Sequence, residues 1–131
     1  MRYKKRKHWK YKTVGDTFHH KAIKPEAPSY GEFLSIAGDG TLLISGGYCY
    51  DGASFIVLDT DNVMYPALIH DALYQLIREG VLKQSDRKRA DEILRELCLE
   101  RGMSTIRAWS IYYGLRAGGG HAAKPDILTV D

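Results

Sequence analysis

The sequence predicts an α+β fold in which a small N-terminal antiparallel β-sheet packs against three helices. Two observations lead to this prediction. Apolar residues fall in short runs between turn residues in the first half of the chain, which is typical of strands. From residue 66 onward they recur every three or four positions, which is typical of helices. With 131 residues, 44% of them hydrophobic, the chain is long enough for one domain with a substantial core.

The first half contains one clear hairpin signal. The apolar runs 33–36 and 41–44 flank the turn sequence Gly-Asp-Gly at 38–40, and glycine readily adopts the positive φ that tight turns require. Prolines interrupt the chain before this hairpin, so residues 17–23 are predicted to form at most an edge strand. A glycine-rich loop follows at 46–54, where the backbone could approach an ion or a ligand closely.

Three helices are predicted in the second half, each with a residue suited to its start and a glycine near its end. Pro66 suits the first turn of a helix that runs to about residue 79. Ser85 and Ser104 can cap a second helix to about residue 101 and a third to the glycine run 118–120. The short connection makes the first two helices antiparallel neighbours. Five residues of the third helix are too apolar to be left in water: Ile106, Trp109, Ile111, Tyr112 and Tyr113.

The net charge of +3 conceals a strong asymmetry along the chain. Residues 1–12 contain many lysines and arginines, no acid, and interleaved aromatic rings. We expect them to form a basic aromatic arm ahead of one globular domain at 13–120 and a flexible tail at 121–131. Cations and rings together suit nucleic acid, an anionic membrane surface or an acidic partner, such as another virion protein. A solvated arm that orders only against a neighbour fits the same composition.

Composition also excludes several classes of protein. No apolar run approaches the roughly 20 residues that cross a bilayer, so no transmembrane segment is expected. The basic N-terminus is not followed by an apolar stretch, so no signal peptide is expected either. Cys49 and Cys98 are far apart and form no C-x-x-C pair, which argues against a disulfide framework and against a zinc knuckle.

Two titratable side chains are predicted to face the buried side of the helix pair. His70 shares a helix face with Leu73 and Tyr74, and Asp91 lies on the apolar side of the next helix. A buried unpaired carboxylate costs several kcal/mol or more, so Asp91 needs a partner, and His70 is the natural candidate. Arg87, four residues before Asp91, could neutralise it instead. The pair is therefore either a structural link between helices or a catalytic or metal-binding site.

Three motifs in order resemble a family of small phage and prophage proteins. They are Asp51-Gly52-Ala53-Ser54, His70-Asp71-Ala72-Leu73-Tyr74, and Arg87 with Ala90-Asp91. The resemblance covers roughly residues 42–118, and the chain departs from the family just after Ser54, where the family often has proline. It implies a phage or prophage origin, with a place in the virion or the host cytoplasm, and no established activity.

The same helix is similar to the H-D-x-x-Y helix of phospholipases A2, including the disulfide-free versions on parvovirus capsids. This resemblance implies that His70 is a general base, that Asp91 orients it and that Tyr74 binds Asp91 through a hydrogen bond. It also implies a calcium site formed by Asp71 together with a loop containing Tyr50, Gly52 and Ser54. The loop lacks the dense glycine run of the calcium loop in that family. A hard cation on oxygen ligands would stabilise a developing oxyanion.

Two functional hypotheses follow. The first is a phage-encoded, calcium-assisted hydrolase with a His70–Asp91 dyad that acts on an ester in a lipid or cell-envelope substrate. The second is a non-catalytic virion or assembly protein, in which the same residues pin the helices together and the arm docks onto neighbouring subunits or nucleic acid. A catalytic set of Ser54, His70 and Asp91 is a weaker alternative, because nothing places Ser54 on a strained turn. An enzyme requires His70 to be reachable from solvent, whereas a structural dyad can be sealed.

Overall fold

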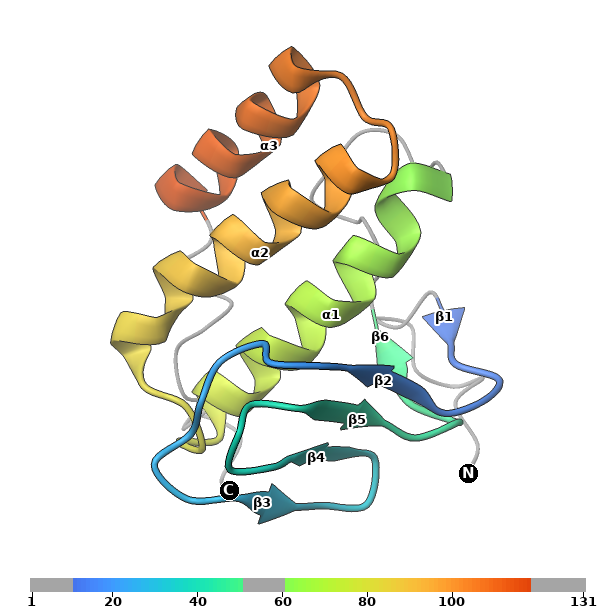
Figure 1. Cartoon of the computed structure of the whole chain (residues 1–131), viewed down its shortest axis with the longest axis vertical. Helices are drawn as coiled ribbons and strands as arrows, with labels where there is room; N and C mark the ends of the chain where they lie inside the picture. Colours follow the sequence, from blue (N-terminus) through green and yellow to red (C-terminus); the bar gives the residue numbers. More distant parts are fainter. Residues whose placement is uncertain (1–10, 51–60, 119–131) are drawn as a thin grey trace, which may run out of the picture.

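The computed structural model describes residues 11–50 and 61–118. Three helices form one layer, and a small antiparallel sheet packs across one end of it (Figure 1). This is the α+β arrangement that the sequence predicts. Residues 1–10, the tail at 121–131, and Gly52 and Ser54 of the predicted calcium loop lie outside the described residues.

The described strands form two separate sheets. Their bounds are β1 Tyr11–Lys12, β2 Thr17–His19, β3 Ser29–Tyr30, β4 Leu34–Ile36, β5 Leu42–Ile44 and β6 Cys49–Tyr50. The four-stranded sheet has the order β2-β5-β4-β3, and β1 pairs with β6. β2 therefore lies at a sheet edge, as expected, and the last two residues of the predicted arm belong to a strand.

The predicted hairpin is formed by β4 and β5. Leu34 lies opposite Ile44 and Ile36 lies opposite Leu42, so one face of the hairpin presents four buried aliphatic side chains to the helices. Gly40 in the connecting turn has a φ of +92°, which favours glycine. The hairpin thus provides the sheet side of the main core.

The helices span α1 Asp61–Arg78, α2 Arg87–Glu100 and α3 Thr105–Gly118, with a 3-10 turn η1 at Gln84–Asp86. The predicted start of the first helix is wrong, because α1 begins before Pro66 and contains it. Val63 is fully buried in a cluster with Leu94 and Cys98 of α2. Tertiary packing of this first turn outweighs the main-chain hydrogen bond that Pro66 cannot donate.

Of the two later helices, α3 has the predicted N-cap and α2 does not. Ser85 does not cap α2, because it lies within η1, where the Asp86 carboxylate accepts a hydrogen bond from the Lys83 main-chain N–H at 2.9 Å. Ser104 does cap α3, since its hydroxyl accepts a hydrogen bond from the Arg107 N–H at 3.2 Å. Thus α2 begins at Arg87, one residue later than a helix capped by Ser85 would.

The expectation that the apolar residues of α3 are buried is only partly correct. Tyr112 is buried, but Ile106 is 82%, Trp109 37% and Tyr113 61% exposed. Figure 1 shows the reason: α3 lies at the outer side of the helical layer, and within the described part of the chain it packs mainly against α2. No helix of the described part of the chain is long and apolar enough to cross a membrane.

Candidate functional site

The candidate site is centred on the carboxylate of Asp91, which is fully buried on α2. Its Oδ1 atom accepts two hydrogen bonds from α1: His70 Nε2 lies at 2.7 Å and the Tyr74 hydroxyl at 2.6 Å. The two donors come from successive turns of α1, so their rings lie side by side with centroids 4.1 Å apart. The predicted contact between His70 and Asp91 is therefore present, and Tyr74 shares the same oxygen.

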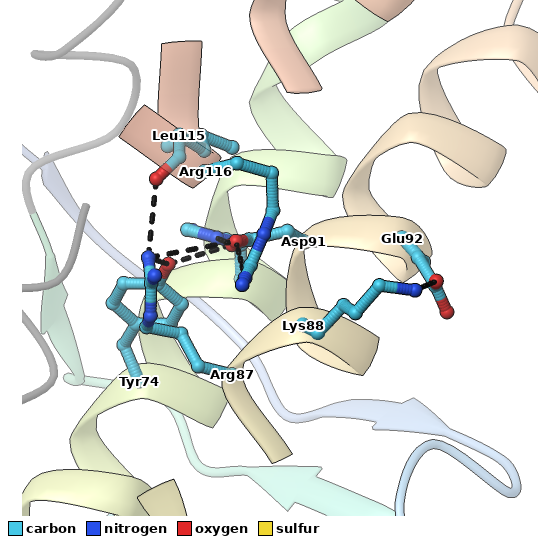
Figure 2. Close-up of polar contacts among 8 residues, drawn as sticks. Tyr74, Arg87, Lys88, Asp91, Glu92, Leu115 and Arg116 are labelled. Carbon is cyan, nitrogen blue, oxygen red and sulfur yellow. Dashed lines mark hydrogen bonds and ion pairs between the residues drawn. The ribbon is translucent and has the colours of Figure 1, made fainter. Parts of the chain in front are cut away.

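The second oxygen of Asp91 faces two arginines (Figure 2). Arg116 of α3 donates to Oδ2 from Nη1 at 2.8 Å, and Nη1 of Arg87 lies 3.7 Å from the same atom. Arg87 also donates to the main-chain oxygen of Leu115 at 3.1 Å and to the Tyr74 hydroxyl at 3.4 Å. One carboxylate thereby joins all three helices, with His70 and Tyr74 on one oxygen and two arginines at the other.

The surroundings of Asp91 keep it ionised. Burial raises the pKa of its carboxyl group, but the hydrogen bonds from His70, Tyr74 and Arg116 outweigh burial and hold the pKa below its ordinary value. An ionised carboxylate only accepts hydrogen bonds, so the hydrogen in the contact with His70 belongs to Nε2. This contact fixes the tautomer of a neutral His70 ring and leaves Nδ1 as the nitrogen that does not face Asp91.

Tyr74 takes part in the site as a neutral donor. Burial is the main cause that raises the pKa of its hydroxyl group, and the hydrogen bond to the Asp91 carboxylate raises it further. The neighbouring Arg87 has the opposite, smaller effect. The phenol therefore stays protonated and donates its hydrogen to Asp91 throughout the neutral range.

The predicted calcium ligands are only partly within the described residues. Asp71 follows His70 on α1 and is half-buried, and the main chain of Tyr50 belongs to β6. The hydroxyl of Tyr48 donates to the Gln75 side-chain oxygen at 2.9 Å. Since Gln75 lies one helical turn beyond Asp71, this bond holds the start of the predicted loop against the same side of α1. Residues 11–50 and 61–118 contain no group of three or more His, Cys, Asp or Glu that could hold a metal ion.

Sequence reasoning missed one member of the site. It considered Arg87 as the neutralising partner of Asp91, but the closer cation is Arg116, which is 25 positions away in the sequence. A weak signal was present, because Arg116 follows directly on Leu115, one of the apolar positions of the third helix. A cation next to the buried face of a helix can reach an acid that is buried on a neighbouring element.

One known protein family matches the chain. A family described as "Protein of unknown function (DUF1353)" matches residues 36–115, which is more than half of the chain. The chain belongs to this family. The matched region extends from the end of β4 to Leu115 and contains His70, Tyr74 and Asp91, and Arg116 is the next residue. No curated protein and no solved structure matches the chain.

Proposed function

We propose that this member of the DUF1353 family is a metal-assisted ester hydrolase in which His70 removes a proton from water. The observation that carries the proposal is the convergence of His70 Nε2 and the Tyr74 hydroxyl on one oxygen of Asp91. This is the arrangement that the resemblance to the H-D-x-x-Y helix implies. Asp91 orients the ring and stabilises it when it becomes positively charged, so Nδ1 is the atom that would accept the proton.

A calcium ion is the metal that this proposal requires. Asp71 would supply a carboxylate oxygen, and the loop containing Tyr50, Gly52 and Ser54 would supply main-chain carbonyl oxygens, which together form the oxygen-rich ligand set that calcium prefers. The Tyr48–Gln75 hydrogen bond supports this pairing, because it holds Tyr48, two residues before Tyr50, against α1 one turn from Asp71. When bound, the ion would polarise the ester carbonyl and stabilise the oxyanion.

The proposed substrate is an ester of a lipid or of the cell envelope, in keeping with an origin in a phage or prophage. The arm at residues 1–12 would contribute by its charge, holding the protein to an anionic membrane surface or to virion components. The proposed location is accordingly the virion or the host cytoplasm.

One observation favours the second hypothesis, a non-catalytic virion or assembly protein. His70 is only 1% exposed, so its ring does not meet the condition of solvent access that an enzyme requires, and Arg116 and Arg87 neutralise Oδ2 of Asp91. A carboxylate that is buried and neutralised by arginines suits a structural link between three helices. In this alternative the network fixes the helices, and binding surfaces elsewhere perform the function.

Calcium titration combined with an ester-hydrolysis assay separates the two hypotheses. The protein is melted with and without calcium chloride, and fatty-acid release is followed on phosphatidylglycerol vesicles. The hydrolase proposal expects calcium to raise the melting temperature, because a ligand that binds only the folded state stabilises it. Asp71→Asn should remove that shift, whereas His70→Gln should keep it and abolish fatty-acid release.

His20→Ala is the matched control, since His20 is an exposed histidine far from Asp91 in sequence. It should retain both the calcium shift and the hydrolysis. If the unaltered protein shows neither a calcium response nor hydrolysis, the proposal is wrong. A large loss of stability in the His70 variant would then support the structural alternative.

A further inference from the structure

Two arginines meet at the junction of α2 and α3, although they share a single carboxylate (Figure 2). Arg116 makes the closer ion pair with Oδ2 of Asp91, at 2.8 Å, and Arg87 lies 3.7 Å from the same oxygen. Within residues 11–50 and 61–118, Asp91 is the only acid that forms an ion pair with either arginine. Two positive charges therefore face one negative charge, and the junction carries a surplus of positive charge.

The acids close to this junction in the sequence are engaged elsewhere. Helix α3 contains no acidic residue. On α2, Glu92 pairs with Lys88 at 2.7 Å, and Glu96 pairs with Arg89 at 2.8 Å. The Asp86 carboxylate accepts a hydrogen bond from a main-chain N–H just ahead of η1, at 2.9 Å. None of these acids balances the second arginine.

Both guanidinium groups also keep donors that the described residues do not use. Their hydrogen bonds and ion pairs with these residues all come from the Nη1 atoms, which contact Asp91, the Leu115 main-chain oxygen and the Tyr74 hydroxyl. Nε and Nη2 of Arg87 and Arg116 have no partner in the described part of the chain, although a guanidinium group carries five N–H donors. The two side chains are 18% and 29% exposed, so they are mostly covered by protein but still accessible to a small solute.

We propose that Arg87 and Arg116 form a binding site for a terminal phosphate group, as carried by a small phosphate ester. Such a group has more than one negative charge at neutral pH and three acceptor oxygens, enough to engage both guanidinium groups. A carboxylate offers only two oxygens. Because the arginines are mostly covered, a phosphate at the end of a small molecule can approach both of them. A phosphodiester is hindered by the groups that it links on both sides.

The phosphate site is separate from the proposed reaction centre. His70 and Tyr74 bind Oδ1 of Asp91, whereas the two arginines face Oδ2. The proposal therefore does not require hydrolase activity. A bound phosphate balances the surplus charge and links α2 to α3, so its binding stabilises the folded protein.

Isothermal titration calorimetry of the full chain with glycerol 3-phosphate, at constant ionic strength, tests the proposal. We expect one binding site per chain, and glycerol, which lacks the phosphate, should not bind. Arg87→Gln should weaken the binding by at least about 10-fold, because it removes charge-assisted hydrogen bonds to the phosphate. Arg87→Lys should restore only part of the affinity, since an ammonium group lacks the planar set of donors.

Arg87 is the position to change because its variants retain the 2.8 Å contact between Arg116 and Asp91. Thermal melting without ligand checks that each variant is folded, and Arg87→Lys supplies the comparison if Arg87→Gln is not. Arg89→Gln is the matched control, since Arg89 lies two positions further along α2 and pairs with Glu96 on the exposed side. It should bind glycerol 3-phosphate as tightly as the unaltered protein.

Two outcomes overturn the proposal: no binding of glycerol 3-phosphate to the unaltered protein, or binding that neither Arg87 variant weakens. If phosphatidylglycerol vesicles bind through Arg87 and glycerol 3-phosphate does not, the ligand is a lipid phosphodiester and the assignment of a terminal phosphate is wrong. If glycerol 3-phosphate binds through Arg87 in a protein that neither responds to calcium nor hydrolyses esters, the phosphate site stands and the hydrolase proposal fails.

Discussion

Replacing Asp91 by asparagine should cost the protein about 3–5 kcal/mol of stability, the usual effect of removing one partner from a buried ion pair. The carboxylate accepts from His70 and Tyr74 on one oxygen and from Arg116 on the other. An asparagine side chain offers one oxygen and one NH₂ group, which is a donor. In either orientation the NH₂ group faces a group that itself needs an acceptor, and Arg116 loses its counter-ion.

Urea unfolding followed by circular dichroism at pH 7 measures this loss, which corresponds to a melting temperature lower by roughly 10–20 °C. Glu96→Gln is the matched control on the same helix, because Glu96 pairs with Arg89 at 2.8 Å on the exposed side. An exposed pair of this kind contributes about 1 kcal/mol at most. If Asp91→Asn costs no more than Glu96→Gln, the network does not stabilise the fold as described.

The stability that Asp91→Asn loses should also depend on pH. The pKa of Asp91 in the folded protein is below its ordinary value of 3.8, so its contribution to stability is complete above that value and is lost as the pH falls through the folded pKa. The stability difference between the unaltered protein and Asp91→Asn should therefore shrink as the pH falls below about 4. A difference that grows below this pH would contradict the assignment of an ionised Asp91.

Two further predictions concern the hairpin and the buried thiol. Gly40→Ala should destabilise the protein by more than about 1 kcal/mol in urea unfolding, because Gly40 has a φ of +92° and a Cβ atom there would lie 3.1 Å from the Ile23 backbone. Gly38→Ala, with no atom within 4 Å and no positive φ, should stay within about 0.5 kcal/mol, and equal losses would contradict the turn geometry. Burial raises the pKa of the Cys98 thiol to about 11, so iodoacetamide at pH 8 should label Cys98 only after unfolding, as mass spectrometry would show. Rapid labelling of the folded protein would contradict its burial.

The central contact of the site could be predicted because it depends on two local rules. Helical periodicity places His70 and Asp91 on apolar faces, and the cost of burying a carboxylate requires a partner for Asp91. The role of Tyr74 came from the resemblance of its motif. Arg116 could not be predicted in the same way, since its contact depends on how α3 lies across α2.

The failed expectations have a common physical origin in tertiary packing. The start of α1 was placed too late because the burial of Val63, which extends the helix ahead of Pro66, is not a local property of the sequence. The apolar pattern of α3 led to the expectation that its large side chains are buried. It could not indicate that α2 covers Tyr112 and leaves Ile106 and Tyr113 exposed.

The convergence of three helices on one carboxylate has a consequence for how the protein opens. A helix that packs mainly through apolar contacts can detach or fray by itself, and its amides then exchange with solvent faster than those of its neighbours. Here, separating α3 from α2 breaks the contact of Arg116 with Asp91, and separating α1 breaks the hydrogen bonds of His70 and Tyr74 with the same carboxylate. Either separation leaves the buried charge of Asp91 with fewer partners. The slowest-exchanging amide hydrogens of the three helices should therefore exchange together, in one cooperative unfolding event.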